Sequence, residues 1–222
     1  MRAAFYAQGS EMGAFQGNLT YKLFFVEGEL PDDWKDRYLQ SIRKFSFEEL
    51  TPDSEEEEAM GWVSVLRPLQ TDFVLNNVVY DDFLCLGLRK DRYTLPSDLL
   101  KAHLEELQRE FMRKNEKQRL SKFEREDLKT IVKRRLKEQT LPKMKVTDMV
   151  WQLSAKRVRY WSQSASQVEV FQEFFEDTFG LNLLPASPYI YALQNDLDDD
   201  ELTNLATVEP ANLVTGSPTI DY

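Results

Sequence analysis

Two charged segments between Leu95 and Pro142 repeat their apolar positions with the period of an α-helix, and a short polar turn separates them. Residues three or four positions apart lie on one face of a 3.6-residue helix, so each segment gathers one mostly apolar row. The first row is Leu100, His103, Leu104, Leu107 and Phe111, and the second is Leu128, Ile131, Val132 and Leu136. The pattern predicts a two-helix hairpin over residues 97–139, with the second row buried.

Local signals mark the ends of this predicted hairpin. Ser97 follows Pro96 and supplies a hydroxyl group suited to capping a helix. At the other end, Pro142 pushes the residue before it out of helical geometry. Inside the turn, Ser121 and Glu124 have the spacing of a capping box, in which each side chain accepts a hydrogen bond from the other's backbone N–H. The second helix is therefore expected to begin after Ser121.

The segments on both sides of the hairpin alternate between strand and helix patterns. Helices are predicted over 31–45, where Trp34, Tyr38 and Ile42 form one apolar row, and over 164–178, which ends at Gly180. Strands are predicted where aromatic and β-branched residues lie between turn signals. These strands are 19–26, 61–65, 72–80, 83–89, 146–153 and 158–161, with 72–80 and 83–89 forming a hairpin.

This order of elements predicts an α+β fold, with one or more antiparallel sheets backed by helices and a protruding two-helix hairpin. Residues 1–18 lack a clear period and are expected to form a flexible arm, followed by the α+β domain over 19–194. Residues 195–222 are acidic and poor in aromatic residues, so we expect a flexible acidic tail. The acidic run 51–58 is expected to lie on a solvated loop.

Charge is distributed unevenly along the chain. The 222 residues carry a net charge of −10, but residues 101–160 hold 18 Lys and Arg against 9 Asp and Glu. Charges more than about 10 Å apart are largely screened at ~0.1 M salt, so a polyanion would respond to the basic region rather than to the total. The candidate DNA contacts are Lys122, Arg125, Lys129, Lys133, Arg134 and Lys137 on the second helix, with Arg113, Lys114, Lys117 and Arg119 at the turn. The alternative is a basic face that is simply solvated.

Few residues have the pattern of a catalytic or metal site. Cys85 lies inside an apolar run and is expected in the core, and His103 is expected to be a buried structural residue. The acidic clusters at 55–58 and 196–201 have the ligands for Mg²⁺ but no ordered scaffold to hold them. We therefore predict a protein that is not an enzyme and has no cofactor or metal. Without a signal-peptide core or a membrane span, it is expected in the cytoplasm.

Several short motifs occur in one order between about Leu19 and Leu193. They are Gly61-Trp62-Val63, Arg89-Lys90, Leu95-Pro96-Ser97, the run from Phe123 to Lys129, Leu141-Pro142 and Val150-Trp151. In this order and spacing the chain resembles the recombination-associated protein RdgC family. The resemblance implies a bacterial nucleoid protein that binds duplex DNA with little sequence preference, forms a ring-like homodimer and limits a recombinase's access to DNA. Typical members continue beyond the point matching Leu193 with a further folded portion that helps to close the ring.

Two hypotheses follow from the residues and the resemblance. In the first, the chain binds duplex DNA independently of sequence, as a homodimer in the nucleoid that works alongside recombination proteins. In the second, it is a protein-interaction module on an RdgC-like scaffold that no longer holds DNA, and the acidic tail occupies the basic face or imitates a phosphate backbone.

Overall fold

The computed structural model describes residues 13–15, 20–54, 56–193 and 197–208 of the chain. Its described part contains a seven-stranded sheet in the order β2-β4-β5-β6-β1-β7, with β3 paired to β4, and every strand pair is antiparallel. The strands are β1 (Lys22–Glu27), β2 (Glu58–Val63), β3 (Val79–Tyr80), β4 (Phe83–Arg92), β5 (Lys143–Gln152), β6 (Arg157–Tyr160) and β7 (Asn182–Pro185). The predicted α+β class with an antiparallel sheet is confirmed.

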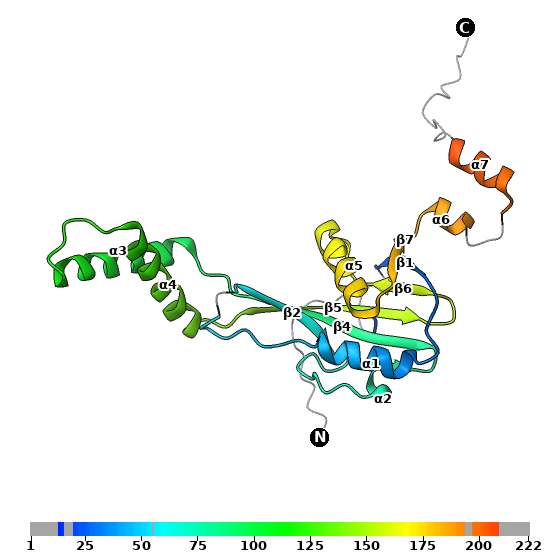
Figure 1. Ribbon diagram of the computed structural model, residues 1–222, viewed down its shortest axis with the longest axis horizontal. Helices are drawn as coiled ribbons and strands as arrows, with labels where there is room; N and C mark the ends of the chain where they lie inside the picture. The colour runs from blue at the N-terminus through cyan, green and yellow to red at the C-terminus, as the bar shows by residue number, and fades with distance from the viewer. Residues whose placement is uncertain (1–12, 16–19, 55, 194–196, 209–222) are drawn as a thin grey trace, which may run out of the picture.

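Strands β4 and β5 form a ribbon that leads to the hairpin. They pair along ten residues, from Phe83 opposite Gln152 to Arg92 opposite Lys143. Five residues after β4 the chain enters α3 (Ser97–Lys114), and α4 (Lys122–Glu138) returns it to β5. The two helices therefore project from one end of the sheet, away from the rest of the molecule (Figure 1). The predicted protruding hairpin is confirmed.

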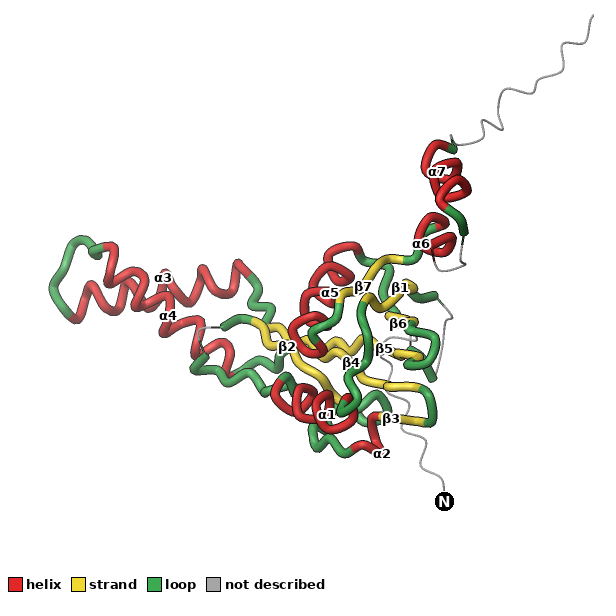
Figure 2. The backbone as a smooth tube through the Cα atoms, turned by 45° about the vertical axis from the view of Figure 1, so that its right-hand side comes forward, coloured by secondary structure: helices red, strands yellow, loops and turns green. Residues whose placement is uncertain are grey.

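Helices α1 (Trp34–Lys44) and α5 (Ala165–Phe179) contact each other and cover one face of the sheet (Figure 2). The core between sheet and helices is largely aromatic. Phe171 stacks on Tyr160 with ring centroids 3.9 Å apart, and Phe175 packs on Trp151 at 5.3 Å. Helix α5 ends at Gly180, as the sequence predicted, and the φ of this glycine is left-handed at 68°.

The Gly61-Trp62-Val63 segment of β2 lies directly against the residues that follow α1. Trp62 exchanges backbone hydrogen bonds of 2.9 Å with Phe45 and Phe47. A Cβ atom at Gly61 would lie 2.4 Å from the Cα atom of Phe47, which is too close for any larger residue. Gly61 thus allows the segment after α1 to lie directly against the edge of the sheet.

The predicted strand over 72–80 is mostly wrong. Residues Leu75–Val78 form the short helix α2, and only Val79–Tyr80 pair with β4. Asn77 provides the physical reason, because its side chain accepts a bond from the Val74 N–H at 3.0 Å and donates to the Asp72 carbonyl at 2.9 Å. These local bonds compete with the ladder of a strand. The turn predicted at 81–82 is present, with Asp81 at a φ of 55°.

The structure describes only part of each end of the chain. Of the expected arm 1–18, only 13–15 are described, and there the Ala14 N–H donates to Asp148 Oδ2 at 2.7 Å. After β7 come the helices α6 (Pro188–Leu193) and α7 (Asp199–Thr207). The expected flexible tail therefore contains a helix, which Asp198 and Glu201 cap reciprocally. The rest of that tail, 195–196 and 209–222, lies outside the described residues.

Cys85 is buried in β4, which confirms its predicted place in the core. Burial, together with the nearby Asp148 carboxylate, raises the pKa of its thiol to about 12. The thiol therefore stays protonated at neutral pH, and a protonated thiol is a poor nucleophile.

Candidate nucleic-acid interface

The capping box predicted for the hairpin is present at the start of α4. Ser121 Oγ accepts a bond from the Glu124 N–H at 3.2 Å, and the Glu124 carboxylate accepts one from the Ser121 N–H at 2.8 Å. The Lys117 ammonium also bonds Glu124 and, with Ser121, lowers the pKa of this carboxyl to about 2. Glu124 is therefore charged at ordinary pH and can accept both bonds.

Helix α3 lacks a comparable cap. Pro96 occupies the N-cap position without a side-chain hydrogen bond, so the capping role predicted for Ser97 is wrong. We expect Ser121→Ala to lower the free energy of unfolding by about 1 kcal/mol, whereas Ser97→Ala should change it by only a few tenths. Urea unfolding followed by far-UV circular dichroism compares the two variants. Equal losses would contradict the cap assigned to Ser121.

The apolar rows of the hairpin are only partly covered. Leu128, Val132 and Leu136 of α4 are buried as predicted, but Ile131 is 42% exposed, and α3 has no buried residue. His103, which we expected to be buried, is exposed. It lines a cavity of about 310 Å³ between α3 and α4, with Glu106, Leu107, Glu110, Val132, Arg135, Leu136 and Gln139. The row on α4 is therefore mostly covered, whereas the row on α3 stays partly in contact with water.

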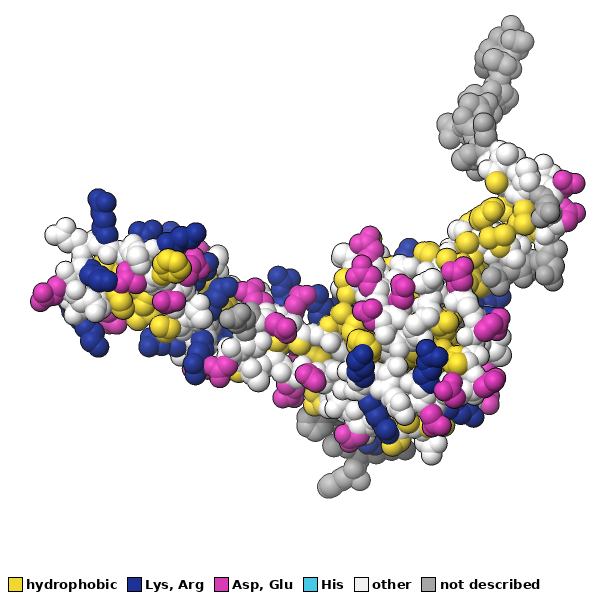
Figure 3. Space-filling model, viewed as in Figure 1, with side chains coloured by type: hydrophobic (Ala, Val, Ile, Leu, Met, Phe, Trp, Pro, Cys, Tyr) yellow, Lys and Arg dark blue, Asp and Glu magenta, His cyan; other side chains and the backbone are white. Residues whose placement is uncertain are grey.

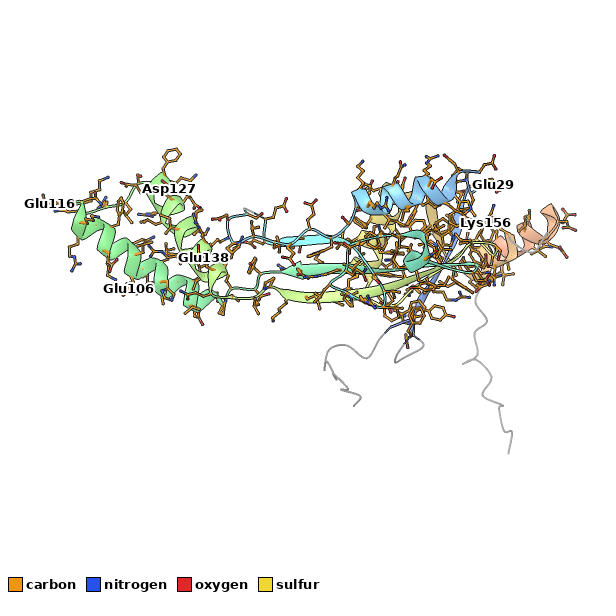
Figure 4. The ribbon with its side chains drawn as sticks, turned by 90° about the horizontal axis from the view of Figure 1, so that it is seen from below. Glu29, Glu106, Glu116, Asp127, Glu138 and Lys156 are labelled. Carbon is orange, nitrogen blue, oxygen red and sulfur yellow. The ribbon has the colours of Figure 1, made fainter. Side chains whose placement is uncertain are left out.

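The ten basic candidates fall into three groups along the hairpin. The tip group is Arg113, Lys114, Lys117 and Arg119. The second group lies on the first half of α4 and consists of Lys122, Arg125 and Lys129, and the base group consists of Lys133, Arg134 and Lys137. Basic and acidic side chains are interspersed on the hairpin surface seen in Figure 3. Figure 4 shows Glu116 at the tip, Asp127 and Glu138 on α4, and Glu106 on α3. Within the described residues, no ion pair involves Arg113, Lys114, Arg119, Lys122 or Arg125.

The base group is held by the acidic run, which we expected to be a solvated loop. Lys133 pairs with Glu57 at 2.6 Å, and Arg134 pairs with Asp53 at 2.7 Å and with Glu138 at 3.2 Å. The hydrogen bond from Lys133 is the main cause of the lowered pKa of Glu57. The loop is exposed as expected, with the side chains of Asp53 and Glu57 67% and 53% exposed, and its carboxylates also form ion pairs at the base of the basic row.

Lys137 has a different role from the rest of the row. It is only 5% exposed, and its ammonium donates to the carbonyl oxygens of Ser54 at 2.8 Å and Glu56 at 3.0 Å. The ammonium also lies 5.4 Å from the ring centroid of Tyr93. Lys137 therefore ties the acidic loop to α4, and in this conformation its charge is not free to contact a phosphate.

None of the helices in the described part of the chain has the length and apolar composition of a membrane span. No group of three or more His, Cys, Asp or Glu side chains there is arranged to hold a metal ion.

Comparison with protein families places this hairpin and sheet in a known group. A family model described as "Putative exonuclease, RdgC" matches residues 31–196, which is most of the chain. The chain belongs to the RdgC family. A search of curated proteins found no match.

The RdgC match begins before α1 and ends after α6. It includes the entire hairpin, the acidic loop paired with its base, and the β4–β5 ribbon. All ten basic candidates lie inside it, while α7 lies outside it. The hairpin, the acidic loop and the ribbon therefore all belong to the part of the chain that the RdgC family model covers.

Proposed function

We propose that this RdgC-family protein binds duplex DNA without sequence preference and without cutting it, in the bacterial nucleoid, and so limits a recombinase's access to DNA. The observation that carries the proposal is that five of the ten candidate cations on the projecting hairpin are exposed and form no ion pair within the described residues: Arg113, Lys114, Arg119, Lys122 and Arg125. Such side chains neutralise phosphates and release condensed counterions, which gives affinity without reading bases.

The exposed apolar residues of the hairpin support a homodimer as the active form. Phe123 is 83% exposed, and Leu99 and Ile131 are more than two-fifths exposed. Apolar side chains left on a two-helix unit are covered when a second hairpin packs against them, as in four-helix bundles. A dimer joined in this way places two basic tips on one DNA molecule, and binding through two sites raises the overall affinity.

A salt-dependent binding experiment tests the DNA proposal. Mobility shifts on two unrelated long duplexes at ~50 and ~200 mM salt should give equal affinities and a steep loss with salt, about 0.9 in log–log slope per phosphate contacted. Replacing these five candidate cations with Gln should reduce the slope by about 4 to 5 for each hairpin that contacts the DNA. The matched control replaces five exposed cations that lie outside the hairpin with Gln: Lys22, Lys35, Arg37, Lys44 and Arg67.

Three outcomes would contradict parts of the proposal. If the wild-type chain does not bind long duplex DNA at ~50 mM salt, the DNA function fails and the protein-interaction hypothesis takes its place. If the control variant loses as much slope as the hairpin variant, net charge rather than the hairpin is responsible. Shortening of linear duplex DNA during incubation with Mg²⁺, and its absence without protein, would show an exonuclease.

A further inference from the structure

Like charges lie directly opposite each other at the hairpin end of the β4–β5 ribbon. Lys90 is opposite Lys145, and Arg92 is opposite Lys143. Directly opposed residues in an antiparallel pair share one face of the sheet, and so do residues two positions further along each strand. The four cations therefore form one patch, about 5 Å across the strands and about 7 Å along them. We name these four residues the ribbon patch.

Opposed like charges destabilise a strand pair, so their neighbours matter. Lys90 forms an ion pair with Glu58 at 2.9 Å. Lys145 bonds only the neutral amide oxygen of Gln167, at 3.0 Å. Arg92 and Lys143 form no ion pair with the described part of the chain. The nearest carboxylate effect is at Glu57, which pairs with Lys133 and whose pKa the charge of Arg92 helps to lower. The ribbon patch thus keeps an excess of positive charge.

The ribbon patch is also accessible. Thr147 and Leu88, one step nearer the sheet centre, are buried, whereas Arg92, Lys143 and Lys145 are exposed. Lys90 and Lys145 line a cavity of about 150 Å³ beside the first turn of α5. Figures 1 and 4 show the ribbon running from the helix-covered part of the sheet to the hairpin without a helix beside it.

We propose that the ribbon patch is a second contact site for the phosphate backbone of duplex DNA, a proposal that rests on the DNA-binding function above. An arrangement of cations that is unfavourable within the chain becomes favourable when phosphates lie against it. Lys143 and Lys145 of the ribbon patch come just after the C-terminal end of α4, and the hairpin tip lies at the other end of this helix. The helix has 17 residues and is therefore about 26 Å long. At ~3.4 Å per base pair, the hairpin tip and the ribbon patch are separated by about 8 base pairs.

A triple variant tests the ribbon patch. Arg92→Gln, Lys143→Gln and Lys145→Gln leave the Lys90–Glu58 pair intact. We expect the log–log salt slope for a long duplex to fall by about 2 to 3 for each chain that contacts the DNA, and a control triple of Lys22→Gln, Lys35→Gln and Arg37→Gln to leave it unchanged. The melting temperature supplies a second measurement. Removing opposed like charges should leave it unchanged or raise it, whereas a structural role for these residues would lower it.

The possible outcomes distinguish the ribbon-patch proposal from the DNA-binding proposal on which it rests. If the wild-type chain binds no DNA, both proposals fail. If the wild-type chain binds and the patch triple keeps its full slope, the ribbon patch alone is overturned and the hairpin function stands. A patch triple that loses binding to polyglutamate but keeps its slope on DNA also overturns the proposal, in favour of an acidic protein partner.

Discussion

We expect Trp151→Ala to lower the free energy of unfolding by about 3–5 kcal/mol, as truncation of a large buried aromatic residue does. Trp151 is fully buried in β5, with Leu84 opposite it on one side and Val158 on the other. Its ring packs against Tyr38, Phe175 and Phe179 at centroid distances of 5.3–5.7 Å, which joins the sheet to α1 and α5. In the described structure its indole N–H has no hydrogen-bond partner, so the loss is one of packing.

Guanidinium unfolding followed by far-UV circular dichroism measures this loss. The matched control is Leu69→Ala, which removes a large apolar side chain that is 77% exposed on a loop away from the hairpin. The control should change stability by less than about 0.5 kcal/mol, as surface substitutions usually do. Comparable losses in the two variants would mean that the core is not centred on Trp151.

The hairpin could be predicted from sequence because its signals are local. Helical periodicity, the proline before Ser97 and the Ser121–Glu124 capping box all act within a few residues, and the structure contains both helices. Exposure was harder to predict. His103 and Ile131 have the right spacing for an apolar face, but a two-helix unit has too little surface to bury both rows.

The segment 72–80 shows where local patterns mislead. A short apolar run is compatible with a strand or with a buried loop, and periodicity alone does not separate them. Phe73 is buried as an apolar residue should be, but its carbonyl accepts two bonds from the Arg43 guanidinium rather than joining a ladder. The backbone there is held both by the local bonds of Asn77 and by this contact between residues 30 positions apart.

The same limitation applies to the candidate site. The basic row on α4 was visible as spacing, but which of its charges remain free depends on a loop about 80 positions away. Lys133 meets Glu57 and Lys137 meets the backbone of Ser54 only because the ribbon brings β2 to the base of the hairpin. The opposed cations of the ribbon patch likewise depend on strand register, which no local pattern determines. Opposite charge in the two segments was the one signal that could have suggested the loop contact.

A buried ion pair between Arg89 and Asp91 lies on the ribbon face opposite the ribbon patch, and we expect its disruption to lower the free energy of unfolding strongly. Arg89 and Asp91 alternate with Lys90 and Arg92 along β4, so they face the other way. The guanidinium bonds the carboxylate at 2.9 and 2.5 Å, and it lies 4.0 Å from the ring centroid of Phe47. Both side chains are buried, so removing one leaves the other charge without compensation.

We therefore expect Arg89→Met alone to cost about 3–5 kcal/mol, whereas Arg89→Met with Asp91→Leu should cost far less, because no unpaired charge is left inside. Urea unfolding of the two variants and of Asp91→Leu forms a double-mutant cycle. If the double variant is as unstable as Arg89→Met, the loss comes from packing on Phe47 and not from the stranded carboxylate. DNA binding links this pair to the ribbon patch: a stable double variant keeps the ribbon register, so it should also keep the wild-type salt slope.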